Sequence, residues 1–298
     1  MPIYIPSNWD NCSTLIEVIY VFAVGVDAIG GAEGETTEWT LDVAGSPRTA
    51  RVYLPKDAIR LASANLPNAG SAGGDSSTSK LPVVFGFHGH GGNSRNAQRS
   101  FQIERHWPEA IVVYMQGLPT PGQLTDPEGK KNGWQKEVGD QNDRDLKFFD
   151  ALLAKLETEF AIDKERIYST GHSNGGGFTY LLWSARSDRF AAFAPCASAA
   201  GRRIPQSPSP KPVLHIAGTN DPLVKFAWQE ATIQRLVTSN ACEQQAVKDA
   251  KVLWSVYPSP KAPVFTFVHD GTHKYPDAAP AMIAQFFKTE PWKTMQDK

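Results

Sequence analysis

Gly171-His172-Ser173-Asn174-Gly175 has the form Gly-x-Ser-x-Gly and stands between a strand-like and a helix-like stretch. Residues 166–170 before it are rich in β-branched and aromatic side chains, and residues 177–183 after it carry apolar side chains at helical spacing. A serine on such a corner presents its hydroxyl above the sheet, and the flanking glycines let the two arms of the backbone approach closely. The stretch therefore predicts an α/β fold with Ser173 as a nucleophile. A solvated serine in a Gly-rich loop is the alternative.

The bulk composition is that of an ordinary globular protein. The chain has 298 residues, a length that fits one large α/β domain or two small ones. Of these residues, 41% are hydrophobic and 20% are charged. The formal net charge is −1 and no long basic run occurs, so a nucleic-acid partner is not expected. The oligomeric state stays open.

The three cysteines indicate neither a disulfide scaffold nor a zinc motif, because no Cys-x-x-Cys pair occurs. One interpretation is a single bridge between Cys196 and Cys242, with Cys12 as the odd thiol. The other interpretation is three free thiols.

Strand-like and helix-like stretches alternate through most of the chain. Apolar or alternating runs predict strands at 38–54 (two strands around a turn), 82–87, 111–115, 167–170, 190–195, 213–217, 252–257 and 264–269. Helical spacing of apolar residues predicts helices at 145–160, 178–185, 227–237 and 278–287. This alternation is typical of a mostly parallel central sheet with helices on both faces, and the first two strands are expected to be antiparallel at one edge.

A single catalytic domain over residues 36–290 accounts for this pattern. Residues 1–35 are interpreted either as a remnant of an export signal or as an extra segment packed on the domain, because their apolar run lacks a preceding positive stretch. Residues 62–80 are expected to form a surface loop, and residues 291–298 a tail. No stretch is long and apolar enough to span a bilayer.

A serine hydroxyl attacks readily only when a base takes its proton, and histidine is the usual base because its pKa lies near neutrality. Three histidines follow Ser173 in the chain. His215 lies inside an apolar run and is expected in the core, whereas His269 lies within a strand. His273 follows that strand in a loop, at a strand end where active-site groups of open α/β sheets gather. We therefore predict His273 as the base, with His269 as its rival.

The base needs a carboxylate that holds its tautomer and stabilises the imidazolium. Asp221 follows the predicted strand at 213–217 and stands between the serine and the histidine in the chain. The order serine, acid, histidine favours Asp221 over its rivals Asp188 and Asp270. Its alternative role is that of a turn or N-cap aspartate before the next helix.

Acyl transfer also needs donors for the developing oxyanion. The backbone N–H of Asn174, directly after the serine, is expected to be one donor. The second should come from a loop after an early central strand, and the Gly-rich loop from His88 to Gly92 follows the strand at 82–87. We assign this donor to the N–H of His90, with Gly91 as a close rival. The alternative is a plain Gly-rich turn.

Taken together, six motifs carry a resemblance. They are, in chain order, His88-Gly89-His90-Gly91-Gly92, Gln116-Gly117, Gly133-Trp134, the nucleophile block Gly171 to Gly176, Gly218 to Asp221, and Gly271-Thr272-His273-Lys274-Tyr275-Pro276. Over about residues 40–288 the chain resembles the polyhydroxybutyrate depolymerase, feruloyl esterase and acetylxylan esterase group of α/β hydrolases. Tyr275 departs from this group, which usually has tryptophan there.

The resemblance implies the α/β-hydrolase fold and serine-dependent hydrolysis of carboxylic esters through an acyl-enzyme. The implied substrates are feruloyl- or acetyl-decorated polysaccharides or polyhydroxyalkanoate-type polyesters, and no metal or organic cofactor is implied. Gln116, Trp134 and Tyr275 would then contact the substrate, with ordinary packing as the alternative for the first two. The resemblance also favours a secreted or periplasmic protein, with the cytoplasm left open. Alternative functions are a serine peptidase of the same fold and a non-catalytic carbohydrate-binding homologue.

Overall fold

The computed structural model describes residues 34–58, 80–122, 124–201, 209–248 and 253–293. The expected extra segment at 1–35 and the expected surface loop at 62–80 lie almost entirely outside these residues, as do Cys12 and most of the C-terminal tail. Cys196 and Cys242 are both free thiols, so the interpretation of a bridge between them is wrong.

Ten strands form one sheet within the described residues, in the order β1-β2-β4-β3-β7-β8-β9-β12-β11-β10. Their bounds are β1 (Gly34–Val43), β2 (Ser46–Pro55), β3 (Leu81–Phe87), β4 (Ile111–Met115), β7 (Ile162–His172), β8 (Ala192–Cys196), β9 (Val213–Gly218), β10 (Val247–Lys248), β11 (Ser255–Tyr257) and β12 (Val264–His269). The six strands from β4 to β12 in this order are parallel to their neighbours, and the pairs at both ends are antiparallel. The mostly parallel sheet and the antiparallel N-terminal strands are thus confirmed.

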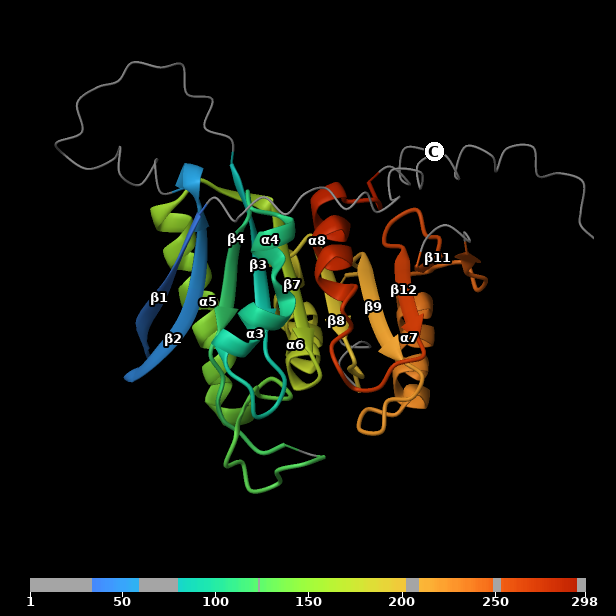
Figure 1. Cartoon of the computed structure of the whole chain (residues 1–298), viewed down its shortest axis with the longest axis horizontal. Coiled ribbons are helices and arrows are strands. Elements are labelled where there is room, and N and C mark those ends of the chain that lie inside the picture. The colour runs from blue at the N-terminus through green and yellow to red at the C-terminus, as the bar shows by residue number, and fades with distance from the viewer. Residues whose placement is uncertain (1–33, 59–79, 123, 202–208, 249–252, 294–298) are drawn as a thin grey trace, which may run out of the picture.

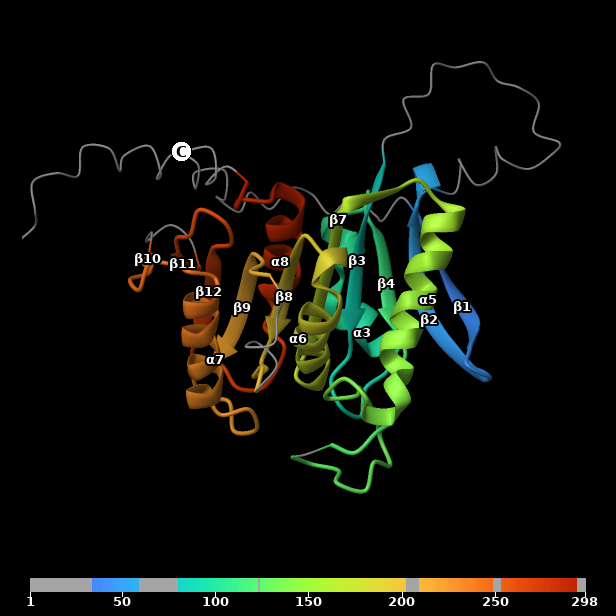
Figure 2. The same ribbon diagram turned by 180° about the vertical axis from the view of Figure 1, so that it is seen from behind.

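Helices cover both faces of this sheet, as predicted. Figure 1 shows one face with α3 (Ser94–Phe101), α4 (Ile103–His106) and α8 (Ala279–Thr289). Figure 2 shows the other face with α5 (Arg144–Glu159), α6 (Asn174–Arg186) and α7 (Phe226–Ser239). Short elements complete the described chain: β5 (Leu118–Pro119), β6 (Asn132–Gly133) and the 3-10 turns η2 (Asp140–Asp143) and η3 (Ser187–Arg189). None of the described helices combines the length and apolar character that crossing a membrane requires.

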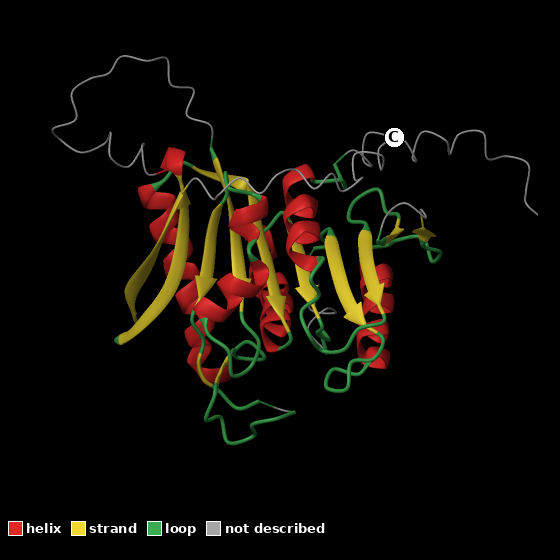
Figure 3. Ribbon diagram, in the orientation of Figure 1, coloured by secondary structure: helices red, strands yellow, loops and turns green. Residues whose placement is uncertain are grey.

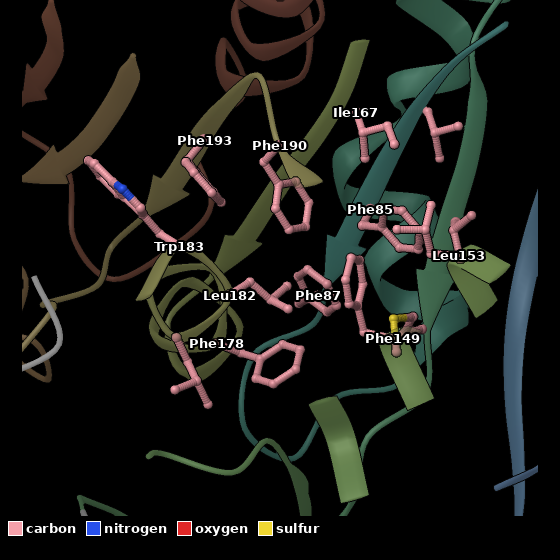
Figure 4. Close-up of a cluster of buried hydrophobic side chains, with 14 of the residues drawn as sticks. Phe85, Phe87, Phe149, Leu153, Ile167, Phe178, Leu182, Trp183, Phe190 and Phe193 are labelled. Carbon is pink, nitrogen blue, oxygen red and sulfur yellow. The ribbon is translucent and has the colours of Figure 1, made fainter. Parts of the chain in front are cut away.

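The core between the sheet and α5–α6 is largely aromatic (Figure 4). Phe85 of β3 meets Phe149 of α5 edge to face, with ring centroids 4.9 Å apart. Trp183 of α6 stacks on Phe193 of β8 at 5.1 Å. Such rings bury large apolar areas. The central strands are continuous apolar runs because helices cover both faces of the sheet. The stripe that predicted the helix at 145–160 faces this core.

Several sequence-based boundaries differ from the structure, and two helices were not predicted. β7 begins at Ile162 instead of residue 167, because the polar residues 163–166 continue the strand past a register shift against β3. The helices α3 and α4 were not predicted, since α3 is mostly polar and buries little more than Ala97 and Phe101.

The carboxyl ends of the parallel strands meet at one edge of the sheet, the lower edge in Figure 3. This edge receives the predicted site residues.

His88 and His215 are buried in this framework, and His172 is partly buried. Burial is the main cause that lowers the pKa of each of them to about 4. The hydrogen-bond partners of His88 fit a neutral imidazole. His88 donates through Nδ1 to the Gly89 carbonyl at 2.8 Å and accepts the Gly117 N–H at Nε2 at 3.0 Å. The prediction that His215 is a core residue is confirmed, and its Nδ1 lies 2.5 Å from the Tyr180 hydroxyl.

These histidines predict a stability that falls as the pH falls from about 6.5 to about 4. Their folded pKa values lie below the ordinary 6.5, so in this window the unfolded chain binds more protons. Each histidine contributes up to about 1.4 kcal/mol per pH unit to the free energy of unfolding. Urea unfolding at pH 7.5, 6, 5 and 4.5 measures this slope. His215→Gln should lower the slope by about one histidine's share, and an unchanged slope would contradict the assignment.

Candidate active site

Ser173 stands on a strained corner between β7 and α6. Its φ of 55° and ψ of −118° are unusual for a residue other than glycine, and such conformations cost about 1–3 kcal/mol. The glycines on either side make the corner possible. A Cβ on Gly171 would lie 2.4 Å from the carbonyl carbon of Gly175, and a Cβ on Gly175 would lie 2.1 Å from the carbonyl oxygen of Phe87. The Gly-x-Ser-x-Gly stretch is therefore a sharp turn that packs against the end of β3.

The structure brings the predicted nucleophile, base and acid together. The Nε2 atom of His273 lies 2.8 Å from the Oγ of Ser173. The Nδ1 atom of His273 lies 2.7 Å from Oδ2 of Asp221. The three side chains come from loops after β7, β12 and β9, which end at the same edge of the sheet. His269 does not take part in this chain of contacts; its Nδ1 accepts the N–H of Gly271 instead.

Asp221 combines the two roles between which the sequence left a choice. Its side chain is fully buried. Its Oδ1 accepts the N–H groups of Leu223 and Val224, both at 2.9 Å, as a turn aspartate would. Its Oδ2 accepts from Gln229 at 3.2 Å and faces His273. The turn contacts hold the carboxylate in the orientation that the histidine contact requires.

His172 was not singled out by sequence reasoning, yet it touches the base directly. Its Nε2 donates to the backbone carbonyl of His273 at 2.7 Å, and the two rings lie 5.0 Å apart. Burial lowers the pKa of His172 to about 4, and the nearby His273 acts in the same direction. A neutral imidazole with its proton on Nε2 therefore holds the loop that carries His273. In the sequence, only the position of His172 next to Ser173 could have indicated this role.

The Gly-rich loop after β3 lies against the serine, as expected. A Cβ on Gly89 would lie 3.5 Å from the Cβ of Ser173. The N–H of Gly91, the rival donor, is already bonded to the carbonyl of Asn132 at 2.7 Å. Within the described residues, no acceptor is bonded to the backbone N–H of His90 or of Asn174. These two donors remain available at the corner.

Two residues expected at the substrate cleft, Trp134 and Gln116, make contacts within the fold. Trp134 is fully buried, stacks on Phe178 with ring centroids 5.1 Å apart, and donates from its indole to the carbonyl of His88 at 2.8 Å. Gln116 accepts the N–H of Ser94 at 3.0 Å, which anchors the start of α3. The burial of Trp134 favours its packing alternative, whereas the expectation that Gln116 contacts the substrate stays a prediction.

A cavity of about 210 Å³ opens beside the Gly-rich loop. It lies between that loop, helix α3 and the side chains of His172 and Tyr275. Its wall is partly aromatic, because Tyr275 packs on Phe101 with ring centroids 4.7 Å apart. The polar side chains of Asn96 and Ser100 stand at the exposed side. Tyr275 thus lines a cavity next to the histidine motif, where the sequence placed it.

The chain resembles curated esterases in sequence. It is 29% identical over 166 residues to a probable feruloyl esterase C of Aspergillus clavatus, covering 54% of this chain and 56% of that protein. It is 29% identical over 127 residues to a bifunctional acetylxylan esterase/xylanase of Neocallimastix patriciarum, covering 43% of this chain and 19% of that protein. The matched part is therefore little more than half the length of the first relative. No family model matches the chain.

Solved structures show the same fold. The fluorophosphonate-binding serine hydrolase F of Staphylococcus aureus superposes with a TM-score of 0.57 at 14% identity, covering 87% of this chain and 98% of that one. A ferulic acid esterase of Anaeromyces mucronatus, solved with ferulic acid, superposes with a TM-score of 0.55 at 17% identity, covering 88% and 91%. The sequence relatives are thus named as esterases, and the solved structures share the fold of this chain.

Proposed function

We propose that this chain hydrolyses carboxylic esters on polysaccharides through an acyl-enzyme on Ser173. The observation that carries the proposal is the line of contacts from Ser173 Oγ through His273 to Asp221, at 2.8 and 2.7 Å. A hydroxyl so close to an imidazole can lose its proton as it attacks, and the buried carboxylate stabilises the imidazolium that forms. The relatives with feruloyl and acetylxylan esterase activity in their names support the choice of substrate class.

Each step of this mechanism has a residue in position. The Oγ of Ser173 bonds to the ester carbonyl carbon while its proton passes to Nε2 of His273. His273 then gives the proton to the leaving alcohol, and the acyl group stays on the serine. A water molecule next attacks the acyl carbon, His273 takes the water's proton, and Ser173 is regenerated as the acid departs. Asp221 keeps the proton of His273 on Nδ1 throughout.

The oxyanion of each tetrahedral intermediate would be held by backbone N–H groups. We assign these to Asn174, which follows the serine in the chain, and to His90, and neither N–H has an acceptor within the described residues. Donors that are oriented in advance are worth more than donors that must be reorganised during the reaction. The engagement of Gly91 with Asn132 supports the choice of His90.

The cavity beside the loop suits an aromatic acyl group such as feruloyl. At about 210 Å³ it is smaller than the roughly 300–1,000 Å³ of pockets for drug-sized ligands. It therefore favours a single ring over a long polyester chain. The aromatic rings of Phe101 and Tyr275 line it, and Asn96 offers an amide to the acyl ring's hydroxyl or methoxy oxygen.

Replacing the serine tests the mechanism. Ser173→Ala should lower kcat for a short p-nitrophenyl ester by roughly 10⁴- to 10⁶-fold, because the three residues act as a unit. The exposed Ser239 at the end of α7 provides the control, and Ser239→Ala should keep the wild-type rate. Fluorophosphonate should label the wild type and the control but not Ser173→Ala. Retained turnover in Ser173→Ala would refute the mechanism.

The same assay separates the alternative functions. A wild-type protein that cleaves an amino-acid anilide faster than an aryl ester would be a peptidase of this fold. A protein that cleaves neither substrate and takes no fluorophosphonate label would be a non-catalytic homologue.

Filling the cavity tests the acyl group. Ser100 is exposed and lines the cavity, so Ser100→Trp should block an aromatic acyl group more than an acetyl group. We expect kcat/KM for methyl ferulate to fall at least about 10-fold, and for p-nitrophenyl acetate to change less than about 3-fold. Arg95→Trp adds the same ring on α3 away from the cavity and should change neither. Equal losses on both esters in Ser100→Trp would contradict an aromatic acyl site.

A further inference from the structure

The His90 side chain is held by a carboxylate that the mechanism does not use. Its Nε2 lies 3.0 Å from Oδ2 of Asp126, and the two side chains are 11% and 9% exposed. Asp126 also accepts the backbone N–H groups of Lys130 at 3.2 Å and Lys131 at 2.8 Å. The Lys131 N–H is the largest cause that lowers the pKa of Asp126, and His90 acts in the same direction. The carboxylate of Asp126 thus connects the His90 ring to the turn that follows Asp126 in the chain.

Two glycines leave the room that the His90 ring occupies. A Cβ on Gly122 would lie 2.7 Å from Nε2 of His90, and a Cβ on Gly133 would lie 2.7 Å from its Nδ1. The ring is therefore enclosed between two stretches of backbone where no other residue type fits without displacement. The next peptide is tied down as well, since the N–H of Gly91 donates to the carbonyl of Asn132.

The same segment holds the other assigned oxyanion donor. The N–H of Trp134 donates to Oδ1 of Asn174 at 2.8 Å. A Cβ on Gly133 would lie 2.9 Å from that same oxygen. We call residues 118–122 and 124–134 the clamp segment. It contacts the side chains of both residues to which we assign the oxyanion donors, although His90 follows β3 and Asn174 follows β7.

We propose that Asp126 is a positioning residue for the oxyanion hole, holding His90 so that its backbone N–H points at the developing charge. The inference rests on the proposed function. Its physical basis is that an oxyanion donor contributes fully only when its direction is set before the reaction. The φ and ψ angles of a Gly-rich loop are weakly restrained by the residues themselves, so the contacts of the His90 side chain add to the restraint that the Gly91 hydrogen bond to Asn132 supplies.

Replacing the carboxylate should affect the transition state more than the ground state. Asp126→Ala should lower kcat for a p-nitrophenyl ester about 10- to 100-fold with KM within about 3-fold, because a misdirected donor loses part of the roughly 10²- to 10³-fold effect of one donor. Affinity for an aryl boronic acid, which forms a tetrahedral adduct with the serine, should fall in parallel with kcat. If the carboxylate only stabilises the loop, Asp126→Ala should lower the melting temperature without lowering kcat more than it changes KM.

Asp140 provides a matched control. It accepts two backbone N–H groups in the neighbouring turn, those of Lys136 at 3.2 Å and Glu137 at 3.1 Å, and no contact to His90 or Asn174 is recorded for it within the described residues. Asp140→Ala should change kcat and boronate affinity less than about 2-fold. His90→Ala should reproduce the loss of Asp126→Ala, and the double variant should lose no more than either single one. If Asp126→Ala fails to fold, Asp126→Asn and His90→Ala carry the same comparison.

The outcomes separate this inference from the proposed function. Ser173→Ala without activity together with Asp126→Ala at the wild-type kcat would overturn the positioning role and leave the serine mechanism standing. Additive losses in the double variant, or equal losses in Asp126→Ala and Asp140→Ala, would also overturn it. Activity retained in Ser173→Ala would refute the proposed function itself.

Discussion

The contact between the corner at Ser173 and the end of β3 is the constraint on which the rest of the site depends. Gly175 lies so close to the carbonyl of Phe87 that any side chain at this position would collide with the backbone. Because of this approach, the loop that begins at His88 lies against Ser173. The strained φ of the serine is maintained by the same packing. The loop that carries the proposed donor His90, the cavity and the clamp segment all adjoin this contact.

The histidines of the site differ in function because they differ in partners. His88 is buried and His172 is partly buried, and each is bonded to a backbone carbonyl. Loss of contact with water lowers the pKa of each ring to about 4 and keeps both rings neutral at pH 7. His273 faces the buried carboxylate of Asp221, and His90 faces Asp126. Neutral rings support backbone geometry at little electrostatic cost, whereas a carboxylate partner suits a ring that must carry a proton or be held firmly.

Several parts of the site could be predicted from the sequence. The chain order serine, acid, histidine of α/β hydrolases selected Asp221 and His273 as the partners of Ser173. The apolar runs showed which segments were strands, and active-site groups gather where these strands end. The glycines around the serine indicated a close backbone approach. The polar helix α3 escaped detection because it has little apolar periodicity, and the first part of β7 escaped because its residues are exposed and charged.

What the sequence determined by itself was therefore the fold class and the three residues at the strand ends, since both depend on local patterns and on chain order. Only the tertiary structure decided how side chains from distant segments meet. Trp134 packs on Phe178, which lies 44 residues later in the chain, and this contact keeps it out of the cleft. Asp126 contacts His90, which lies 36 residues earlier. Such contacts depend on how loops fold over the sheet edge, and no local periodicity encodes that path.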